Sequence, residues 1–394
     1  MTVSIHSVTL TLGNGLELAP IFASLTLDES WSPFAQASVT VTTPADLSLI
    51  DPRLDITADL RFTARYGSLA FVSDYSVLYG AGLVSALTTA WASKLVSAIS
   101  GDPERSFNPE FVASSQRFAR LGIRSREVRE DGTTVLGLAS AEALLQDLRI
   151  MLDVGWINRE TVRELVSLFF DQFLAGDKSL HTFVLAPGVT DGFLPFGQNT
   201  LYPEARYQYL IMGASWWDMI APFVLAANLR LWCDELGVFQ LTPRSVTLPG
   251  TITISAAVNL TAATDTISRA GDEWADSVIM IWRWMKPDGV RDTAISVWPV
   301  TDTNPSKTLL IEEDSPPPFS VSTPMGERPA ALVYARVSGR GHQMPVKAIS
   351  DYSVTPGQTA LITLPDTAPQ TGFIQSVSWS FPADEMTITA RNLT

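Results

Sequence analysis

Polar and apolar residues alternate through the last fifty residues of the chain. One face of the extended chain collects Phe373, Val377, Trp379 and Phe381, and the other collects Ser376, Ser378 and Ser380. Residues 382–385 supply a turn, after which Met386, Ile388 and Ala390 resume the apolar face. Alternation of this kind predicts half-buried strands. We therefore predict a strand meander that closes a sheet or a small barrel.

The first region shows the same period of two. Strands are predicted over residues 8–12, 18–27, 37–41, 54–66, 122–128 and 133–138. Asn14 and Gly15 mark a tight turn, and residues 31–34 mark a bend. Ser140 is the predicted N-cap of a short helix over 141–149. The spacing fits an antiparallel sheet or barrel.

A stretch of small and apolar residues interrupts this region at about 76–115. Leu83, Leu87, Trp91 and Leu95 fit helical spacing. Two interpretations are a membrane-inserting segment and a packed helix. Lys94 and the many Ser and Thr residues argue against a spanning helix, because a charge in the apolar zone is costly. We predict a packed helical insertion between strands.

The middle region starts with a helical pattern. Asn158 is a suitable N-cap and Gly176 would end the helix. The apolar stripe between them comprises Val162, Leu165, Val166, Phe169, Phe170 and Phe173. Ser215 and Asp218 have the spacing of a capping box and begin a second helix, which Pro222 should shorten or kink. A hairpin over 229–241 follows.

The last region returns to strands, predicted over 252–254, 276–285 and 292–300. A turn at 286–289 joins the second and third of these strands. An extended loop containing residues 315–318 comes next, and then a helix from Pro329 to about Ser338. The closing meander ends the region, which shares with the first region a set of strands accompanied by a helix.

Composition narrows the possible functions. A chain of 394 residues suits two or three domains. Hydrophobic residues make up 46% and charged residues only 17%, which fits either a large core or a surface covered by partner subunits. The net charge of −14 without Lys or Arg clusters argues against a nucleic-acid binder. An acidic surface would suit a channel through which DNA slides, and ordinary solubility charge explains the balance equally well.

The single cysteine, Cys233, excludes an intrachain disulfide and is predicted to be a small buried hydrophobe. The first residues lack a basic start followed by an apolar run, so we expect no signal peptide and synthesis in the cytoplasm.

Candidate chemistry is sparse. The three histidines, His6, His181 and His342, have no partners at metal-ligand spacing. The densest carboxylate clusters are Asp272, Glu273 and Asp276 around Trp274, and Glu312, Glu313 and Asp314. A glycosidase needs two cooperating carboxylates, but adjacent acids on a strand point to opposite faces, and acidic runs in loops are usually solvated. We therefore predict no catalytic residue, no cofactor and no metal site.

Several segments, taken in order, resemble one known family. Residues 31–41 match an early strand, and residues 136–145 match a strand that leads into a helix. Residues 215–241 match a helix followed by a hairpin that bears Asp234 and Gly237, and residues 275–279 match the entry to a second barrel. Residues 352–391 match a closing meander, with Thr355, Pro356 and Gly357 ahead of one of its strands. Over nearly the whole chain they resemble phage tail hub proteins, the baseplate-hub or tail-associated family of long-tailed bacteriophages.

The resemblance implies an α+β, mainly β fold with two related antiparallel β-barrel domains flanking an α+β domain. The expected domains are 1–152, a first hub barrel with the helical insertion at about 76–115; 153–247, the α+β middle domain; and 248–394, the second hub barrel. It implies a homotrimeric, non-enzymatic virion protein at the tail tip. The ring would adapt the six-fold tail tube to the three-fold tip and enclose the channel for DNA ejection.

The implied partners are the tail tube, the distal tail protein ring, the tape measure protein and tip or fibre proteins, with DNA passing through the lumen without specific binding. The insertion has no counterpart in the family pattern. Because the chain stops at Thr394, we expect any fibre, receptor-binding or wall-degrading activity to lie on another chain.

A second hypothesis is a glycan-binding or glycan-cleaving tail-tip protein, in which Trp-rich sheets and acidic clusters form a sugar groove. A trimer would favour the hub, and binding of host surface polysaccharide would favour the alternative. A minor third possibility is membrane contact by residues 76–100 during infection. Liposome flotation of the intact chain against one lacking 76–115 would test it.

Overall fold

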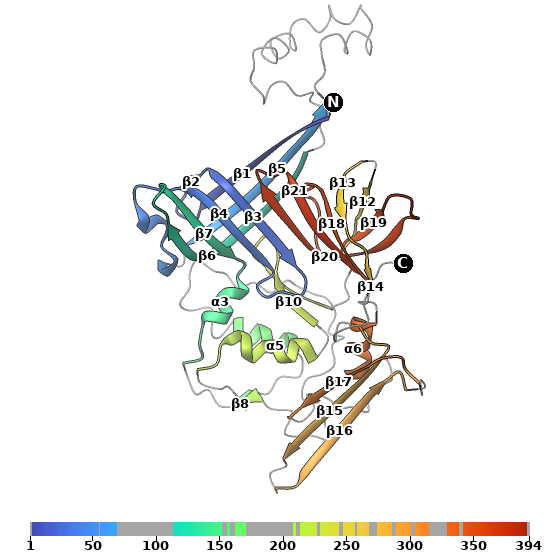
Figure 1. The fold of residues 1–394 in the computed structure, drawn as a ribbon. Helices are drawn as coiled ribbons and strands as arrows, with labels where there is room; N and C mark the ends of the chain where they lie inside the picture. Colours follow the sequence, from blue (N-terminus) through green and yellow to red (C-terminus); the bar gives the residue numbers. More distant parts are fainter. Residues whose placement is uncertain are drawn as a thin grey trace, which may run out of the picture.

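The protein is mainly β, which confirms the expected α+β, mainly β fold class (Figure 1). The computed structural model describes residues 2–54, 56–68, 113–151, 156–157, 162–170, 208–209, 213–226, 229–243, 247–256, 258–267, 274–285, 289–300, 304–314, 329–338 and 342–391.

A fourteen-stranded, mostly antiparallel sheet dominates the fold. Seven of its strands come from the first region: β1 (Thr2–Leu12), β2 (Glu17–Leu18), β3 (Pro20–Asp28), β4 (Ala35–Thr42), β5 (Thr57–Ser68), β6 (Ala113–Val128) and β7 (Thr133–Ala139). They pair in the order β3-β4-β7-β6-β5-β1-β2, and β1 and β5 extend beyond their neighbours (Figure 1). All six strands predicted for this region are confirmed. Leu54, however, lies in a 3-10 turn, η2 (Pro52–Leu54), and β5 begins only at Thr57.

The other seven strands come from the last region: β12 (Thr251–Ser255), β13 (Leu260–Ala263), β14 (Thr266–Ile267), β18 (His342–Ile349), β19 (Thr359–Thr363), β20 (Gln370–Phe381) and β21 (Glu385–Arg391). Strand β20 pairs with β3 from Ser376 opposite Asp28 to Phe381 opposite Ala23. The two regions therefore share one continuous sheet and one hydrophobic core. The described strands follow an open path from β13 to β2.

Strand β20 departs from simple alternation at one point. Its pairing with β21 shifts between Ile374 and Ser376, which is a β-bulge, and a bulge inserts one extra residue into the strand. Ile374, Val377 and Trp379 are consequently all buried, and Phe373 is half-buried. The prediction that Phe373 shares the face of Val377 and Trp379 is wrong, because the bulge breaks the period of two. The prediction for the latter two residues is confirmed.

The middle region packs three helices against a hairpin. Its elements are α3 (Glu142–Asp147), β8 (Trp156–Ile157), α4 (Val162–Leu168), β9 (Gln208–Tyr209), α5 (Trp216–Ala226), β10 (Leu229–Cys233) and β11 (Phe239–Pro243). The predicted apolar stripe of α4 is buried through Phe170, and the predicted hairpin is β10–β11. Helix α5 continues past Pro222 to Ala226.

The helix starts illustrate a correct and an incorrect cap prediction. At α5, Ser215 Oγ accepts a hydrogen bond of 2.9 Å from the Asp218 N–H, as predicted. At α3 the N-cap position is Ala141, and no side chain caps it. The Ser140 hydroxyl instead accepts from Ala35 N at 3.1 Å, because Ser140 directly follows β7 and faces the neighbouring strand β4.

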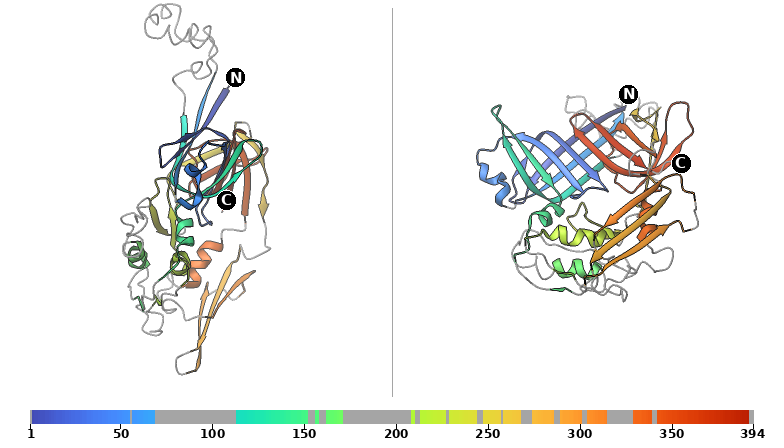
Figure 2. Two further views of the ribbon diagram at one scale, coloured as in Figure 1. Left: turned by 90° about the vertical axis from the view of Figure 1, so that its left-hand side faces the viewer. Right: turned by 60° about the horizontal axis from the view of Figure 1, so that its bottom comes forward.

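A small, separate sheet carries α6 on one face. It comprises β15 (Ser277–Met285), β16 (Arg291–Trp298) and β17 (Thr308–Glu313), with α6 (Pro329–Val337) beside them (Figure 2). Strand β15 is central, antiparallel to β16 and parallel to β17. The predicted strands and helix are confirmed. Strand β17 was not predicted, and its acidic end was expected to lie in a loop.

No helix among the described residues is long and apolar enough to cross a membrane. The predicted insertion at about 76–115 lies outside the described residues until β6 begins at Ala113. The predictions for Asn158, Phe173, Gly176 and the loop at 315–318 also lie outside them.

Candidate assembly surfaces

The candidate chemical residues are held in structural contacts. His342 Nε2 lies 2.5 Å from Asp265 Oδ1. The Asp276 carboxylate accepts from Ser306 Oγ at 2.5 Å, from Lys307 N at 2.7 Å and from Ser306 N at 2.8 Å, and these hydrogen bonds lower the pKa of Asp276 to about 2. Glu312 forms a 2.8 Å ion pair with Arg283, which lowers the pKa of Glu312. His181, Asp272 and Glu273 lie outside the described residues.

Within the described part of the chain, no group of three His, Cys, Asp or Glu side chains could hold a metal ion. Cys233 is buried, as predicted, and its burial raises the pKa of the thiol well above the usual value.

An aliphatic face covers the side of the small sheet away from α6. Alternate residues of β15 point to this side, and Ile279 has Val297 of β16 and Leu310 of β17 as its direct neighbours. Ile281 is flanked in the same way by Ile295 and Glu312. Ile295 is 55% exposed and Leu310 53%. The ion pair of Arg283 and Glu312 lies on the same side, next to Ile281. Apolar surface bordered by polar residues is typical of a protein interface.

The opposite side of the small sheet explains why this face stands open. Val278, Trp282 and Trp284 of β15 are buried on the α6 side, and Ser296 Oγ accepts from the Ala330 N–H at 3.2 Å, which ties the start of α6 to β16. A single helix covers one face of a sheet only. The aliphatic face, defined here as Ile279, Ile281, Ile295, Val297 and Leu310, is the main apolar surface of this sheet.

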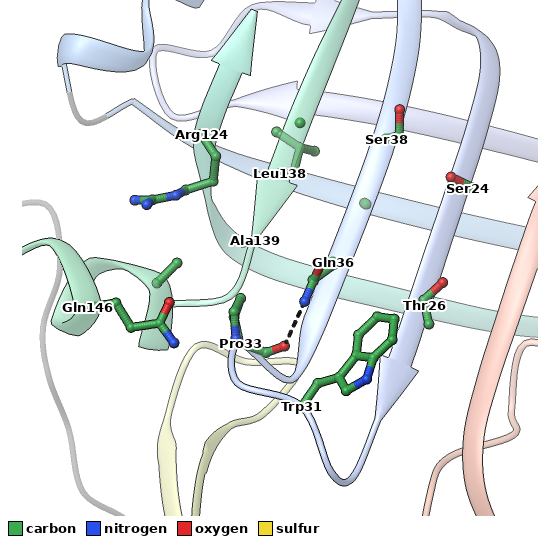
Figure 3. Close-up of a pocket in the computed structure, with 13 residues that line it drawn as sticks. Ser24, Thr26, Trp31, Pro33, Gln36, Ser38, Arg124, Leu138, Ala139 and Gln146 are labelled. Carbon is green, nitrogen blue, oxygen red and sulfur yellow. Dashed lines mark hydrogen bonds between the residues drawn. The ribbon is translucent and has the colours of Figure 1, made fainter. Parts of the chain in front are cut away.

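A groove with a mixed polar and apolar lining lies on the outer face of the large sheet (Figure 3). It has a volume of about 450 Å³, and Trp31 stands at one side of it. Its floor is formed by β3, β4 and β7, where Ser24, Ser38 and Gly137 are direct cross-strand neighbours. Trp31 was expected in a bend and at the start of the segment that resembles an early strand of the family. A Trp two residues before a Pro at a predicted turn was the available signal for an exposed aromatic side chain.

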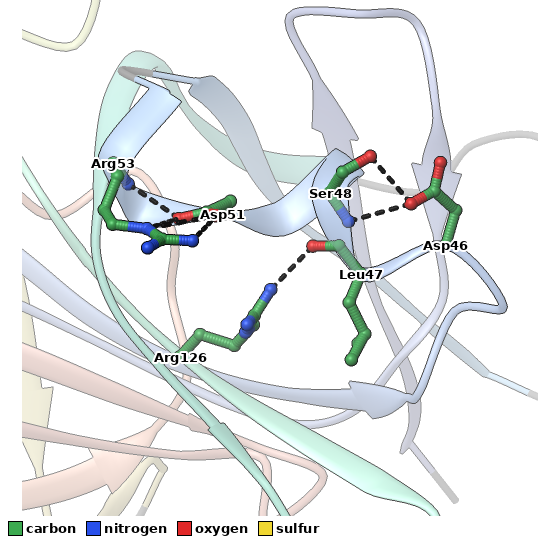
Figure 4. Close-up of polar contacts among 6 residues, drawn as sticks. All are labelled: Asp46, Leu47, Ser48, Asp51, Arg53 and Arg126. Atoms are coloured by element: carbon green, nitrogen blue, oxygen red, sulfur yellow. Dashed lines mark hydrogen bonds and ion pairs between the residues drawn. The ribbon is translucent and has the colours of Figure 1, made fainter.

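The connection between β4 and β5 is fixed by short-range polar contacts (Figure 4). Asp46 Oδ1 accepts from Ser48 N at 2.9 Å and begins a 3-10 turn, η1 (Leu47–Ile50). Asp51 pairs with Arg53 at 2.6 Å, which lowers the pKa of Asp51. Arg126 Nη1 of β6 donates to Leu47 O at 2.6 Å. These contacts hold the corner against the sheet, and we assign them a structural role.

A buried junction joins the large sheet to the middle region. The Glu142 side chain is fully buried, and its Oε1 accepts from Phe34 N at 3.2 Å and from Cys233 N at 2.8 Å. Burial raises the pKa of this carboxyl, and the two backbone donors oppose the rise. One side chain of α3 thus holds the β3–β4 connection and the β10–β11 hairpin in place. Sequence analysis did not identify Glu142.

Charged groups surround this junction. The Arg230 guanidinium lies over Phe34 and Trp232, with its central carbon 4.7 and 4.9 Å from the ring centroids. Burial lowers the pKa of Arg230 to about 10, although the carboxylates of Glu29, Glu142 and Asp28 oppose this. Glu29 in turn forms a two-bond ion pair with Arg391 of β21. The junction therefore draws on the first, middle and last regions of the chain.

A buried histidine leads to a pH prediction. His6 Nδ1 lies 3.0 Å from Tyr352 Oη and 3.4 Å from Asp384 Oδ1, and its side chain is 1% exposed. Burial lowers the His6 pKa below its usual 6.5, and the Asp384 carboxylate partly opposes this. The unfolded chain therefore binds a proton more readily than the folded chain. The free energy of unfolding therefore has its full value above about pH 6.5, where His6 is neutral in both states, and it decreases as the pH falls below that value.

We expect the thermal midpoint of the wild type to fall more steeply than that of His6→Gln as the pH is lowered from about 8 to about 5.5. Differential scanning fluorimetry across this range checks the prediction. The comparison concerns the slopes, so a constant offset of the variant does not affect it. Parallel curves would contradict the assignment of the slope to His6.

No protein-family model matches the chain, and no curated protein matches its sequence. The fold, however, is similar to solved tail proteins along almost the full length. A tail protein from Neisseria meningitidis MC58 superposes with a TM-score of 0.55 at 10% identity, covering 98% of this chain and 96% of the other. The 43 kDa tail protein of prophage MuSo2 from Shewanella oneidensis superposes with a TM-score of 0.54 at 12% identity, covering 99% of this chain and 100% of the other.

A third similar structure is the prophage tail protein gp18 from Listeria monocytogenes EGD-e, with a TM-score of 0.54 at 8% identity, covering 98% of this chain and 94% of the other. The chain has the fold of phage tail proteins. This confirms, at the level of the fold, the resemblance seen in the sequence.

Proposed function

We propose that this chain is a structural, non-catalytic component of a phage or prophage tail. The observation that carries the proposal is the full-length similarity of fold to three tail proteins of comparable size. The aliphatic face on the small sheet adds support, because an assembly protein needs surfaces that become buried in its complex.

Within this role, we propose the hub at the distal end of the tail: a homotrimer that adapts the six-fold tube to a three-fold tip. The two halves of the large sheet, joined through β3 and β20, are the candidates for the two related barrel units. The domain division at residues 152 and 247 stays part of this proposal. The net charge of −14 supports a lumen that DNA and the tape measure protein traverse without binding.

The aliphatic face is proposed to contact the neighbouring copy in the ring. Substitution of Ile295 by lysine would place a charge in the centre of that contact, and an unpaired buried charge is costly. Ile295 is 55% exposed in the single chain, so the change leaves the monomer fold intact. The control is Leu54→Lys, since Leu54 is 56% exposed on the far corner of the large sheet.

Native mass spectrometry and negative-stain images of the three proteins test the proposal. We expect a three-copy ring with a central hole for the wild type and Leu54→Lys. For Ile295→Lys we expect at least about a tenfold lower association constant, as for an interface hot spot. A different closed oligomer would contradict the hub. A trimer whose stability is unaffected by Ile295→Lys would be consistent with the proposed hub and would exclude the aliphatic face as the interface between its subunits.

A further inference from the structure

The groove on the outer face of the large sheet has an aromatic wall held on a rigid loop. Trp31 is 46% exposed, yet hydrogen bonds fix the loop on both sides of it. Asp28 Oδ1 accepts from Ser30 N at 2.7 Å, and Glu29 N donates to Gln375 O at 3.0 Å. Gln146 Nε2 of α3 donates to Ser32 O at 2.9 Å. A loop that is already ordered loses little entropy when a ligand binds to it.

The remaining lining of the groove mixes small or apolar residues with polar ones, and Arg124 is the one charged residue among them. Six polar side chains line it: Ser24, Thr26, Ser38, Gln36, Gln146 and Arg124. Three of them also hold contacts within the protein, since Thr26 Oγ1 lies 2.9 Å from Ser378 Oγ and the Gln36 and Gln146 amide N–H groups donate to Pro33 O and Ser32 O. The one cation, Arg124, is ion-paired with Asp147 through Nη1, and a guanidinium carries five N–H donors in all. Small residues, including Ala37, Gly137 and Ala143, keep the floor low between the Trp31 loop and α3.

These features match the chemistry of a sugar ring. A hexopyranose has a face of C–H groups, which packs on the indole ring of a Trp, and a rim of hydroxyls, which pair with amide, hydroxyl and guanidinium groups. The groove has a volume of about 450 Å³ and is open to solvent along the sheet, so it would hold a sugar ring by one side. We propose that the groove binds a neutral hexopyranose unit of an oligosaccharide.

The groove is a binding site and not a hydrolytic one. A glycosidase places two carboxyl groups across the scissile bond, and the residues lining this groove include no Asp or Glu. The inference is independent of the proposed hub, because it concerns the outer face of a single chain. Failure of one does not imply failure of the other.

Saturation-transfer NMR on the intact chain tests the proposal, with maltotriose, cellotriose, β-1,4-galactotriose and triacetylchitotriose as probes. We expect saturation transfer to at least one of them, strongest at the ring C–H protons of a single face. Trp31→Ala should weaken that binding about tenfold, in line with the loss of an aromatic stack. Ser38→Trp, at an exposed strand position, should fill the groove and abolish binding.

The matched control is Phe22→Ala. Phe22 lies on β3 and is 57% exposed, but it does not line the groove, so we expect unchanged binding. The absence of saturation transfer to all four sugars would overturn the proposal, as would equal binding by the wild type and Trp31→Ala. Stronger binding of trigalacturonate than of any neutral probe would overturn the assignment to a neutral sugar.

Discussion

Replacement of Trp379 by alanine is expected to lower the free energy of unfolding by about 3–5 kcal/mol, the usual cost of removing a large buried aromatic side chain. Trp379 is fully buried in β20, and its ring lies 6.0 Å from that of Tyr352 between centroids. Its indole N–H also donates to Asp351 O at 3.0 Å. Because β20 pairs with both β21 and β3, the cavity would weaken both halves of the large sheet.

Urea unfolding followed by circular dichroism measures the effect. Trp31→Ala is the control, because Trp31 is half-exposed and a surface substitution usually changes stability by less than about 0.5 kcal/mol. Similar unfolding midpoints for the two variants would show that Trp379 does not hold the core of the sheet together.

Glu142→Ala is the second change with a large expected effect, a loss of about 2–4 kcal/mol. The substitution leaves the backbone N–H groups of Phe34 and Cys233 without their acceptor, and each unsatisfied buried donor costs about 1–3 kcal/mol. Glu142→Gln keeps a carbonyl oxygen at the same place, so we expect it to retain most of the stability. The contrast separates hydrogen bonding from simple loss of volume.

Hydrogen–deuterium exchange locates the damage. In Glu142→Ala, the peptides that contain Phe34 and Cys233 should exchange faster, while those of the small sheet stay unchanged. Exchange that rises evenly over the whole chain would mean that Glu142 contributes general stability and does not specifically hold this junction. Equal effects of the alanine and glutamine variants would contradict the hydrogen-bond explanation.

Local patterns predicted most strands because side chains in a strand alternate with a period of two. The same rule failed at Phe373, where a bulge shifts the alternation. Strand β17 was missed because its apolar run of three residues ends in two acids, and its parallel partner lies some thirty residues away. A short run of this kind does not distinguish a strand from a loop.

The candidate surfaces were less predictable than the strands. The exposure of the aliphatic face depends on which side of the small sheet α6 covers. The position of α6 in turn depends on packing between segments far apart in the sequence. Glu142 reads in the sequence as an ordinary exposed residue of a helix, and its burial follows from the approach of the hairpin more than eighty residues later. Strand pairing and helix docking depend on contacts between residues far apart in the sequence, whereas residue propensity and polar–apolar alternation report only local conformation.

The pairing of β3 with β20 also bears on how the chain is made. The partners Leu27 and Val377 are 350 residues apart, and a ribosome adds about 5–20 residues per second. The hydrogen-bonding edge of β3 therefore waits roughly 20–70 seconds for its partner to be synthesised. An unpaired strand edge is a template for aggregation. Production at low temperature or with added chaperones should therefore raise the yield of this protein, and a chain truncated before β20 should accumulate in the insoluble fraction.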